Sequence, residues 1–315
     1  MKIAALQMVS TPRVGDNLAA ARRLIEEAAQ AGAVLVGLPE YFCLIGRSDT
    51  DKLHVAEAPG EGPIQAMLSQ AARECGVWVM GGTLPMKTDE PERVTNSNCV
   101  YAPDGSLVAR YDKIHLFRFD SGKERYDESR VLKAGHQPVV FDMRTGPASE
   151  RPVAADPMAA TAESLMGDLL GLTAPVAHAV VPAVAPDEYA LRVGLSVCYD
   201  VRFPELYRKL SFETGGRPCD LFAVPAAFTY TTGQAHWELL LRARAVENLC
   251  YVMAPAQGGT HENGRRTYGH SMIVDPWGQV LAVKDEREGV VLADLQLDRL
   301  AEVRQQLPAL EHRVM

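Results

Sequence analysis

The stretch Leu191-Arg192-Val193-Gly194-Leu195-Ser196-Val197-Cys198-Tyr199-Asp200 runs from an apolar segment into a single thiol. Its aliphatic and β-branched residues predict a buried strand over 191–197. A helix is predicted over 204–214, after the proline that follows Phe203. Cys198 therefore lies between the end of a strand and the beginning of a helix.

Similar strands and helices alternate on both sides of this stretch. Strands are predicted at 3–7, 33–38, 77–80, 98–101, 107–111, 221–224, 251–254, 271–274, 280–283 and 290–294. Helices are predicted at 17–30, 61–75, 235–248 and 298–306. This mixed order indicates an α/β fold of layered α+β type.

One segment breaks the alternation. Residues 144–187 are rich in alanine, proline and methionine and show little periodicity. We interpret them as an insertion in one domain that spans residues 1–315. A surface segment is one interpretation, and a lid or an interface is the other.

Composition excludes several classes of protein. The 315-residue chain has 47% hydrophobic residues and a formal net charge of -8, so a binding surface for nucleic acid or an anionic membrane is not expected. No apolar run is long enough to span a bilayer, and the N-terminus lacks a signal peptide pattern. We expect a soluble cytoplasmic protein.

The six cysteines are scattered, without a C-x-x-C pair, so neither a disulfide framework nor a structural zinc site is expected. They are Cys43, Cys75, Cys99, Cys198, Cys219 and Cys250. Most should be ordinary buried thiols.

Three polar residues each follow a predicted strand: Glu40, Lys113 and Cys198. Strand ends gather at one edge of an α/β sheet, where ligands bind. A thiol needs a base, which Glu40 can supply. Lys113 and the backbone N–H of Tyr199 could stabilise an oxyanion, at roughly 3 kcal/mol each. The three residues together indicate a hydrolytic site.

Each of these residues also has a structural interpretation. Cys198 could be a core thiol, Glu40 a helix cap and Lys113 a solvated turn residue. The spacing alone leaves these alternatives open.

Three segments resemble the nitrilase superfamily of carbon–nitrogen hydrolases. They are Leu38-Pro39-Glu40-Tyr41-Phe42, Tyr111-Asp112-Lys113-Ile114-His115-Leu116-Phe117, and Gly194-Leu195-Ser196-Val197-Cys198-Tyr199-Asp200-Val201-Arg202-Phe203-Pro204-Glu205. The resemblance implies that Glu40 is the general base, Lys113 the oxyanion stabiliser and Cys198 the nucleophile. It also implies that Glu128 positions Lys113 and the substrate.

The same resemblance implies a four-layer α-β-β-α sandwich that pairs into homodimers or assembles into higher homo-oligomers. No metal and no organic cofactor are expected. The implied reaction converts a terminal carboxamide to a carboxylate and ammonia through a thioester.

Tyr199 stands where true nitrilases carry tryptophan, which favours amide over nitrile substrates. Further segments look like the branch that hydrolyses deaminated glutathione. They are 225–229, 232–238, 242–247 and 268–272. The alternatives are an omega-amidase acting on α-ketoglutaramate, another small aliphatic amidase, or a non-catalytic interaction protein with the same fold.

Four residues are candidates for binding the small amide substrate: Tyr199, Arg202, Phe228 and Thr229. The guanidinium of Arg202 could bind a substrate carboxylate, or could pair with Glu205 or Asp200. His236 and Trp237 are more typical of helix packing. The polar, glycine-rich segment 258–269, which carries Arg265 and Arg266, is either a solvated loop or a substrate-access loop.

Overall fold

The computed structural model describes residues 1–120, 122, 125–144, 190–214 and 216–314. The chain divides into a main unit, Met1–Phe141 with Arg192–Met315, and a short unit, Asp142–Leu191. The described parts of the short unit belong to the end of strand β9 (Val139–Arg144) and the start of β10 (Ala190–Leu195). Nearly all of the expected insertion at 144–187 lies outside the described residues, so the single-domain organisation stays a prediction.

The first sheet has seven strands in the order β17-β1-β2-β3-β5-β4, with β6 paired to β5. Strands β1, β2 and β3 run parallel, while the hairpins and β17 add antiparallel strands. Their bounds are β1 Lys2–Gln7, β2 Leu35–Gly37, β3 Trp78–Met80, β4 Leu84–Lys87, β5 Val94–Tyr101, β6 Leu107–Asp112 and β17 Gly289–Asp294.

The second sheet has six strands in the order β16-β15-β12-β11-β10-β9. Strands β10, β11 and β12 are parallel, so their carboxyl ends lie at one edge. The remaining bounds are β11 Leu221–Ala223, β12 Tyr251–Ala254, β15 Met272–Val274 and β16 Val280–Val283. Every residue of β11 and β12 is buried, as expected for parallel strands covered on both faces.

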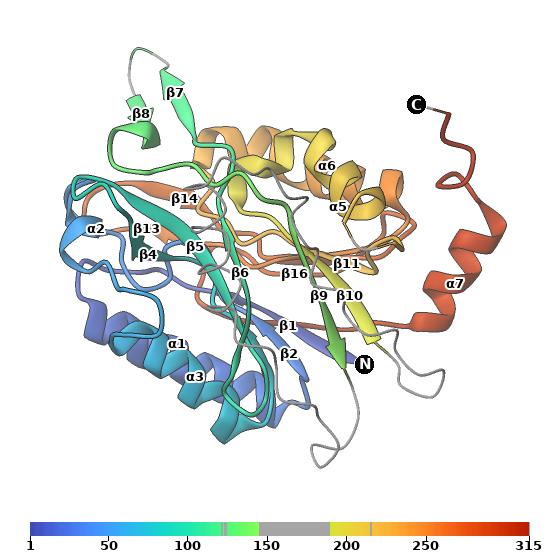
Figure 1. Cartoon of the computed structure of the whole chain (residues 1–315), viewed down its shortest axis with the longest axis horizontal. Helices are drawn as coiled ribbons and strands as arrows, with labels where there is room; N and C mark the ends of the chain where they lie inside the picture. Colours follow the sequence, from blue (N-terminus) through green and yellow to red (C-terminus); the bar gives the residue numbers. More distant parts are fainter. Residues whose placement is uncertain (121, 123–124, 145–189, 215, 315) are drawn as a thin grey trace, which may run out of the picture. The chain divides into compact units, whose positions relative to one another are not determined.

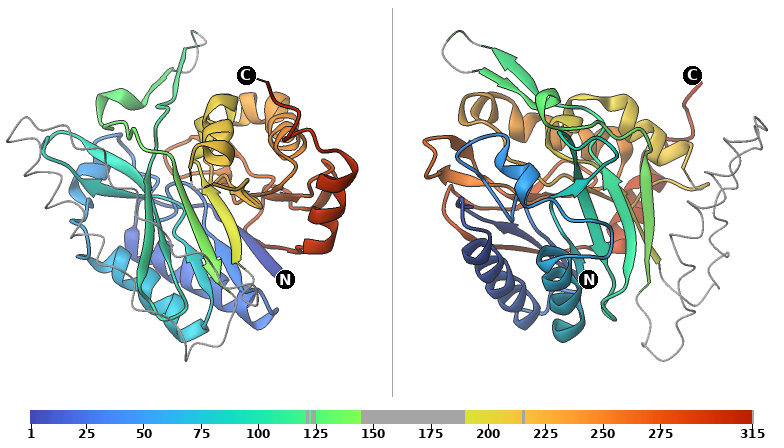
Figure 2. Two further views of the ribbon diagram at one scale, coloured as in Figure 1. Left: turned by 45° about the vertical axis from the view of Figure 1, so that its right-hand side comes forward. Right: turned by 60° about the vertical axis from the view of Figure 1, so that its left-hand side comes forward.

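Helices cover the outer faces of the two sheets in the main unit (Figures 1 and 2). Helices α1 (Val14–Gln30) and α3 (Pro63–Cys75) pack on the first sheet, and α6 (Tyr230–Asn248) packs on the second, next to α5 (Pro204–Phe212). Strands β1 and β12 contact each other between the sheets. The predicted four-layer α-β-β-α arrangement is confirmed. Short α2 (Asp51–His54) and C-terminal α7 (Leu297–Gln306) complete the helices of the described residues.

Helix α1 shows why the periodicity predicted these elements. Its buried side chains recur on one face, at Asn17, Ala21, Leu24, Ile25 and Ala28. Burying a leucine or isoleucine side chain fully is worth roughly 1.5–3 kcal/mol. The amphipathic pattern thus fixes which face of the helix meets the sheet.

Helix α6 begins at Tyr230, five residues before its predicted start at 235. The sequence did not predict the first turn because it contains Gly233, and glycine is unfavourable inside helices. A Cβ on Gly233 would lie 2.3 Å from the Cβ of Tyr268, so the close packing of this helix requires glycine.

Strands β4 and β9 were not predicted, and neither were two small hairpins. Strands β7 (Arg118–Asp120) and β8 (Arg125–Asp127) form one, and β13 (Gly258–Thr260) and β14 (Arg266–Tyr268) form the other. The second lies within the glycine-rich segment interpreted as a loop. Strands β13 and β14 could not be predicted from periodicity, because both are largely polar and neither shows an alternation of apolar residues.

Candidate active site

The three strand-end residues meet in the main unit. Glu40 follows β2 by three residues, Lys113 follows β6 directly, and Cys198 begins a 3₁₀ helix shortly after β10. Their exposed fractions are 1%, 1% and 7%. Glu128, which begins a 3₁₀ helix after β8, reaches the same place. The four residues therefore surround one buried site.

Lys113 lies between the two glutamates. Its Nζ donates to Glu40 Oε1 at 2.9 Å and to Glu128 Oε1 and Oε2 at 3.0 and 2.8 Å. Burial disfavours the ammonium, but Glu128 and Glu40 outweigh it and raise the pKa of Lys113. Burial acts to raise the pKa of Glu128, but Lys113 reverses this and holds that pKa below its ordinary value. The lysine is thus a fixed cation at neutral pH.

The carboxylate of Glu40 is held on both oxygens. Oε1 also accepts from Asn96 Nδ2 at 2.9 Å, and Oε2 accepts from the backbone N–H of Ala227 at 2.9 Å. Asn96 lies on β5, and Ala227 lies in the loop between β11 and α6. They fix the direction of the carboxylate, as a general base requires.

Cys198 has a left-handed backbone conformation, with φ of 49°. Its backbone N–H donates to Pro225 O at 2.8 Å, which holds this turn against the next strand. Such strain in a non-glycine residue is often found at functional sites. Burial, and next the charge of Glu40, raise the pKa of the thiol well above its ordinary value. The resting sulfur is therefore a protonated thiol.

Asp200 is a site residue whose role the sequence did not reveal. Its fully buried carboxylate accepts from Tyr111 Oη at 2.7 Å and from the backbone N–H of Val197 at 2.8 Å. It also binds the backbone N–H and the Nδ1 of His115. The turn after Cys198 is thereby joined to the turn after Lys113.

Three of the four predicted substrate-binding residues line the cavity beside Cys198: Tyr199, Phe228 and Thr229. The cavity measures about 10 Å³, room for roughly one water molecule. Residues that the sequence did not place there also line it: Phe117, Ala227, Thr232 and Arg265.

Arg202 is not among the residues that line this cavity. Its guanidinium lies 5.8 Å from the Tyr199 ring and 5.2 Å from the Phe228 ring, and its Nη2 is 3.3 Å from His236 Nδ1. Trp237 is fully buried and donates to His270 O at 2.9 Å, in keeping with its predicted packing role. Binding of a carboxylate by Arg202 stays a prediction.

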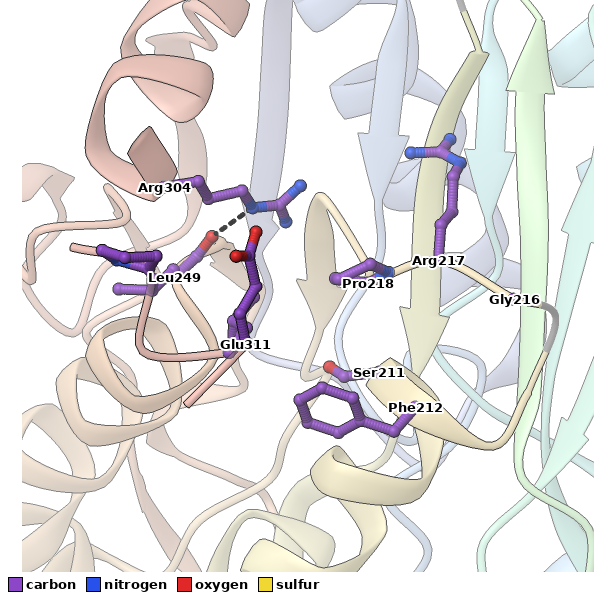
Figure 3. A pocket seen from close by; sticks show the side chains of 10 residues that line it. Ser211, Phe212, Gly216, Arg217, Pro218, Leu249, Arg304 and Glu311 are labelled. Atoms are coloured by element: carbon purple, nitrogen blue, oxygen red, sulfur yellow. Dashed lines mark hydrogen bonds between the residues drawn. The ribbon is translucent and has the colours of Figure 1, made fainter. Parts of the chain in front are cut away.

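A larger cavity of about 380 Å³ lies away from these groups, between the end of α5 and the segment after α7 (Figure 3). Arg304 borders it and donates from Nε to Leu249 O at 3.0 Å. No acid, base and nucleophile converge on it comparable with Glu40, Lys113 and Cys198. The smaller cavity is therefore the candidate active site.

Within the described residues, no three His, Cys, Asp or Glu side chains come together as a set that could hold a metal ion. In the same part of the chain, no helix has the length and apolar character needed to cross a membrane.

A buried thiol beside a fixed carboxylate and a paired ammonium, on two covered sheets, is the arrangement of a cysteine hydrolase. Residues 2–305 match the carbon-nitrogen hydrolase family, and the chain belongs to this family. The resemblance noted in the sequence is thereby confirmed, and so is the class of enzyme, a carbon–nitrogen hydrolase that acts on amides.

Three similar proteins illustrate this membership. A deaminated glutathione amidase of Synechocystis sp. is 40% identical, over 99% of this chain and 97% of its own. Omega-amidase NIT2 of Xenopus tropicalis is 34% identical, over 99% and 94%. The crystal structure of Saccharomyces cerevisiae Nit3, a member of the nitrilase superfamily, has a TM-score of 0.75 at 26% identity, over 98% and 94%.

Proposed function

We propose that the chain hydrolyses deaminated glutathione through a thioester on Cys198. The observation that carries this proposal is the contact of Lys113 with both Glu40 and Glu128 in the cavity that holds the thiol. The name of the 40% identical Synechocystis relative supports the choice of substrate.

In the first half of the reaction, Sγ of Cys198 attacks the amide carbonyl carbon. Because the pKa of the thiol is raised, its proton passes to Glu40 as the carbon–sulfur bond forms. Negative charge grows on the carbonyl oxygen, where Lys113 and the backbone N–H of Tyr199 stabilise it. Glu128 holds Lys113 in place for this task.

Glu40 then gives its proton to the leaving nitrogen, and the carbon–nitrogen bond breaks. The acyl group stays on Cys198 as a thioester. In the second half, Glu40 takes a proton from a water molecule, which attacks the thioester carbon. The carboxylic acid leaves, and the proton returns to sulfur.

The leaving group depends on the substrate. Glutathione has no primary carboxamide, so cleavage of its deaminated form at the γ-amide releases the amine of cysteinylglycine. Ammonia, the product expected from the sequence, is released only from a primary amide such as α-ketoglutaramate. Both substrates pass the same 2-oxoglutaryl group to Cys198.

The second candidate is an omega-amidase that acts on α-ketoglutaramate. Its substrate is the smaller of the two, and the cavity beside Cys198 is small, about 10 Å³. The 34% identical Xenopus relative carries that name.

The test compares kcat/KM for the two substrates by the 2-oxoglutarate that both release, with Cys198→Ala as the blank. A higher value for deaminated glutathione supports the first candidate, and the reverse selects omega-amidase. No Cys198-dependent product from either substrate would refute both.

We propose further that the chain works in the cytoplasm as a homodimer. All six cysteines are free thiols, as in a reducing compartment. Leu239 and Val246 of α6 and nearby Trp277 are exposed at 69%, 44% and 55%, an apolar surface that a second copy would cover. Light scattering should give twice 34.3 kDa, and cell fractionation should recover the protein with cytosolic markers.

A further inference from the structure

Arg265 and Glu40, the proposed general base, both form a hydrogen bond with the backbone of Ala227. Arg265 follows a turn closed by the His261 backbone N–H, which donates to Arg265 O at 2.9 Å. The guanidinium Nη2 donates to Ala227 O at 3.0 Å, and the N–H of Ala227 donates to Glu40 at 2.9 Å. The backbone of Ala227 thus connects the guanidinium to the base.

The guanidinium is held in place but carries unused donors. Its carbon lies 5.2 Å from the Tyr126 ring centre, and Nη2 is fixed on Ala227. The buried Nε has no hydrogen-bond partner among the described residues. An arginine has five N–H donors in a planar fork that matches a carboxylate. A buried donor without a partner is unfavourable, so a ligand that supplies an acceptor there would remove that cost.

Neighbouring charges in this loop are already paired. Arg266 contacts Glu286 at 2.8 Å, and Glu262 contacts Arg13 at 2.7 Å. Arg265 forms no ion pair with a carboxylate in the described part of the chain, although it lines the cavity of Cys198. The positive charge of Arg265 is therefore available to a ligand in the cavity.

The charges of the site favour a further cation for binding an anionic substrate. Glu40 and Glu128 both contact the ammonium of Lys113, and Lys52 acts on them at longer range, so these two cations are already engaged with carboxylates. An incoming carboxylate would lie near two glutamates in a buried cavity. A guanidinium beside that cavity offsets their repulsion, and it can bind the carboxylate with two parallel hydrogen bonds.

We propose that Arg265 binds a carboxylate at the far end of the substrate's acyl chain, so that the site selects ω-carboxylated amides. This inference rests on the proposed function, because it places the acyl group on Cys198. It assigns to Arg265 the carboxylate contact that the sequence suggested for Arg202. The 2-oxoglutaryl group, shared by both candidate substrates, has such a carboxylate.

The test uses glutaramate and pentanamide, which differ only by a carboxylate in place of a methyl group. The wild-type protein should prefer glutaramate in kcat/KM. Arg265→Met should lower the ratio of the two values at least tenfold, chiefly through KM for glutaramate, and Arg265→Lys should restore part of it. Arg266→Met is the matched control, which should keep the ratio within twofold. Circular dichroism checks that each variant is folded.

An equal loss for both amides in Arg265→Met would overturn the inference, because it would indicate a structural role. A wild-type protein without preference for glutaramate would overturn it as well. If neither amide is hydrolysed, the proposed function fails for these substrates, and calorimetric binding of glutarate decides the inference instead. Glutarate should then bind the wild type at least tenfold more tightly than Arg265→Met, and equal affinities would refute the contact.

Discussion

The carboxylate of Asp200 binds His115 twice, accepting from its backbone N–H at 3.0 Å and contacting its Nδ1 at 2.7 Å. Asp200 lies two residues after Cys198, and His115 lies two residues after Lys113. The contact therefore fixes the distance between Cys198, the proposed nucleophile, and Lys113, the proposed oxyanion stabiliser. The His115 ring also stacks on Phe203 with a centroid distance of 3.7 Å, which holds the imidazole in position.

Replacing Asp200 with asparagine should misplace these two turns. The amide has one acceptor oxygen for the four donors that the carboxylate serves, and unsatisfied buried groups cost roughly 1–3 kcal/mol each. We expect kcat to fall at least about tenfold, with a smaller change in KM. Steady-state kinetics beside the exposed Glu205→Gln control would check this, and a wild-type kcat in Asp200→Asn would contradict it.

Removing the charge of Lys113 should destabilise the fold as well as stop turnover. Lys113→Met leaves Glu40 and Glu128 buried without their cation, and breaking such a pair costs about 3–5 kcal/mol. Urea unfolding should show this loss. The exposed Lys87→Met is the control.

The double variant Lys113→Met with Glu128→Gln separates the two effects. Stability should partly return, because one buried charge is removed, while turnover stays absent. If the double variant is no more stable than Lys113→Met, the buried charges are not the cause of the loss.

Much of the site could be predicted because each of its three main residues follows a strand. Glu40 and Lys113 follow β2 and β6 of the first sheet, whereas Cys198 follows β10 of the second sheet. The rule of one sheet edge therefore accounts for the first two residues, and the packing of the two sheets brings Cys198 to them. The contacts of Asp200 and Arg265 could not be predicted in this way. Asp200 and His115 are separated by 85 positions, and Arg265 reaches Ala227 from a hairpin without an apolar pattern. Such pairs depend on tertiary packing, which local periodicity does not record.

The raised pKa of Cys198 predicts an unusual pH dependence of alkylation. Since the thiolate is the reactive form, labelling by iodoacetamide should still increase at pH 9, where an ordinary cysteine approaches its plateau. Burial is the main cause and the charge of Glu40 the next, so Glu40→Gln should speed labelling at pH 8 while it removes turnover. Peptide mass spectrometry can follow Cys198, with N-acetylcysteine added to the same sample as the ordinary thiol, because burial also raises the pKa of Cys75. A labelling plateau below pH 7 would refute the prediction.

Lowering the pH should destabilise the loop that carries Arg265, because His261 of that loop becomes protonated. This buried imidazole contacts Ser10 O through Nδ1 at 2.9 Å and Thr267 Oγ1 through Nε2 at 2.8 Å, and burial lowers its pKa from 6.5 to about 4. A lowered histidine pKa gives stability that is complete above pH 6.5 and is lost as pH falls toward 4. The shift corresponds to about 3 kcal/mol. His261→Gln should therefore flatten the decline of unfolding free energy between these pH values, whereas the exposed His312→Gln should not. Parallel pH curves for the wild type and His261→Gln, measured by urea unfolding, would show that another group causes the decline.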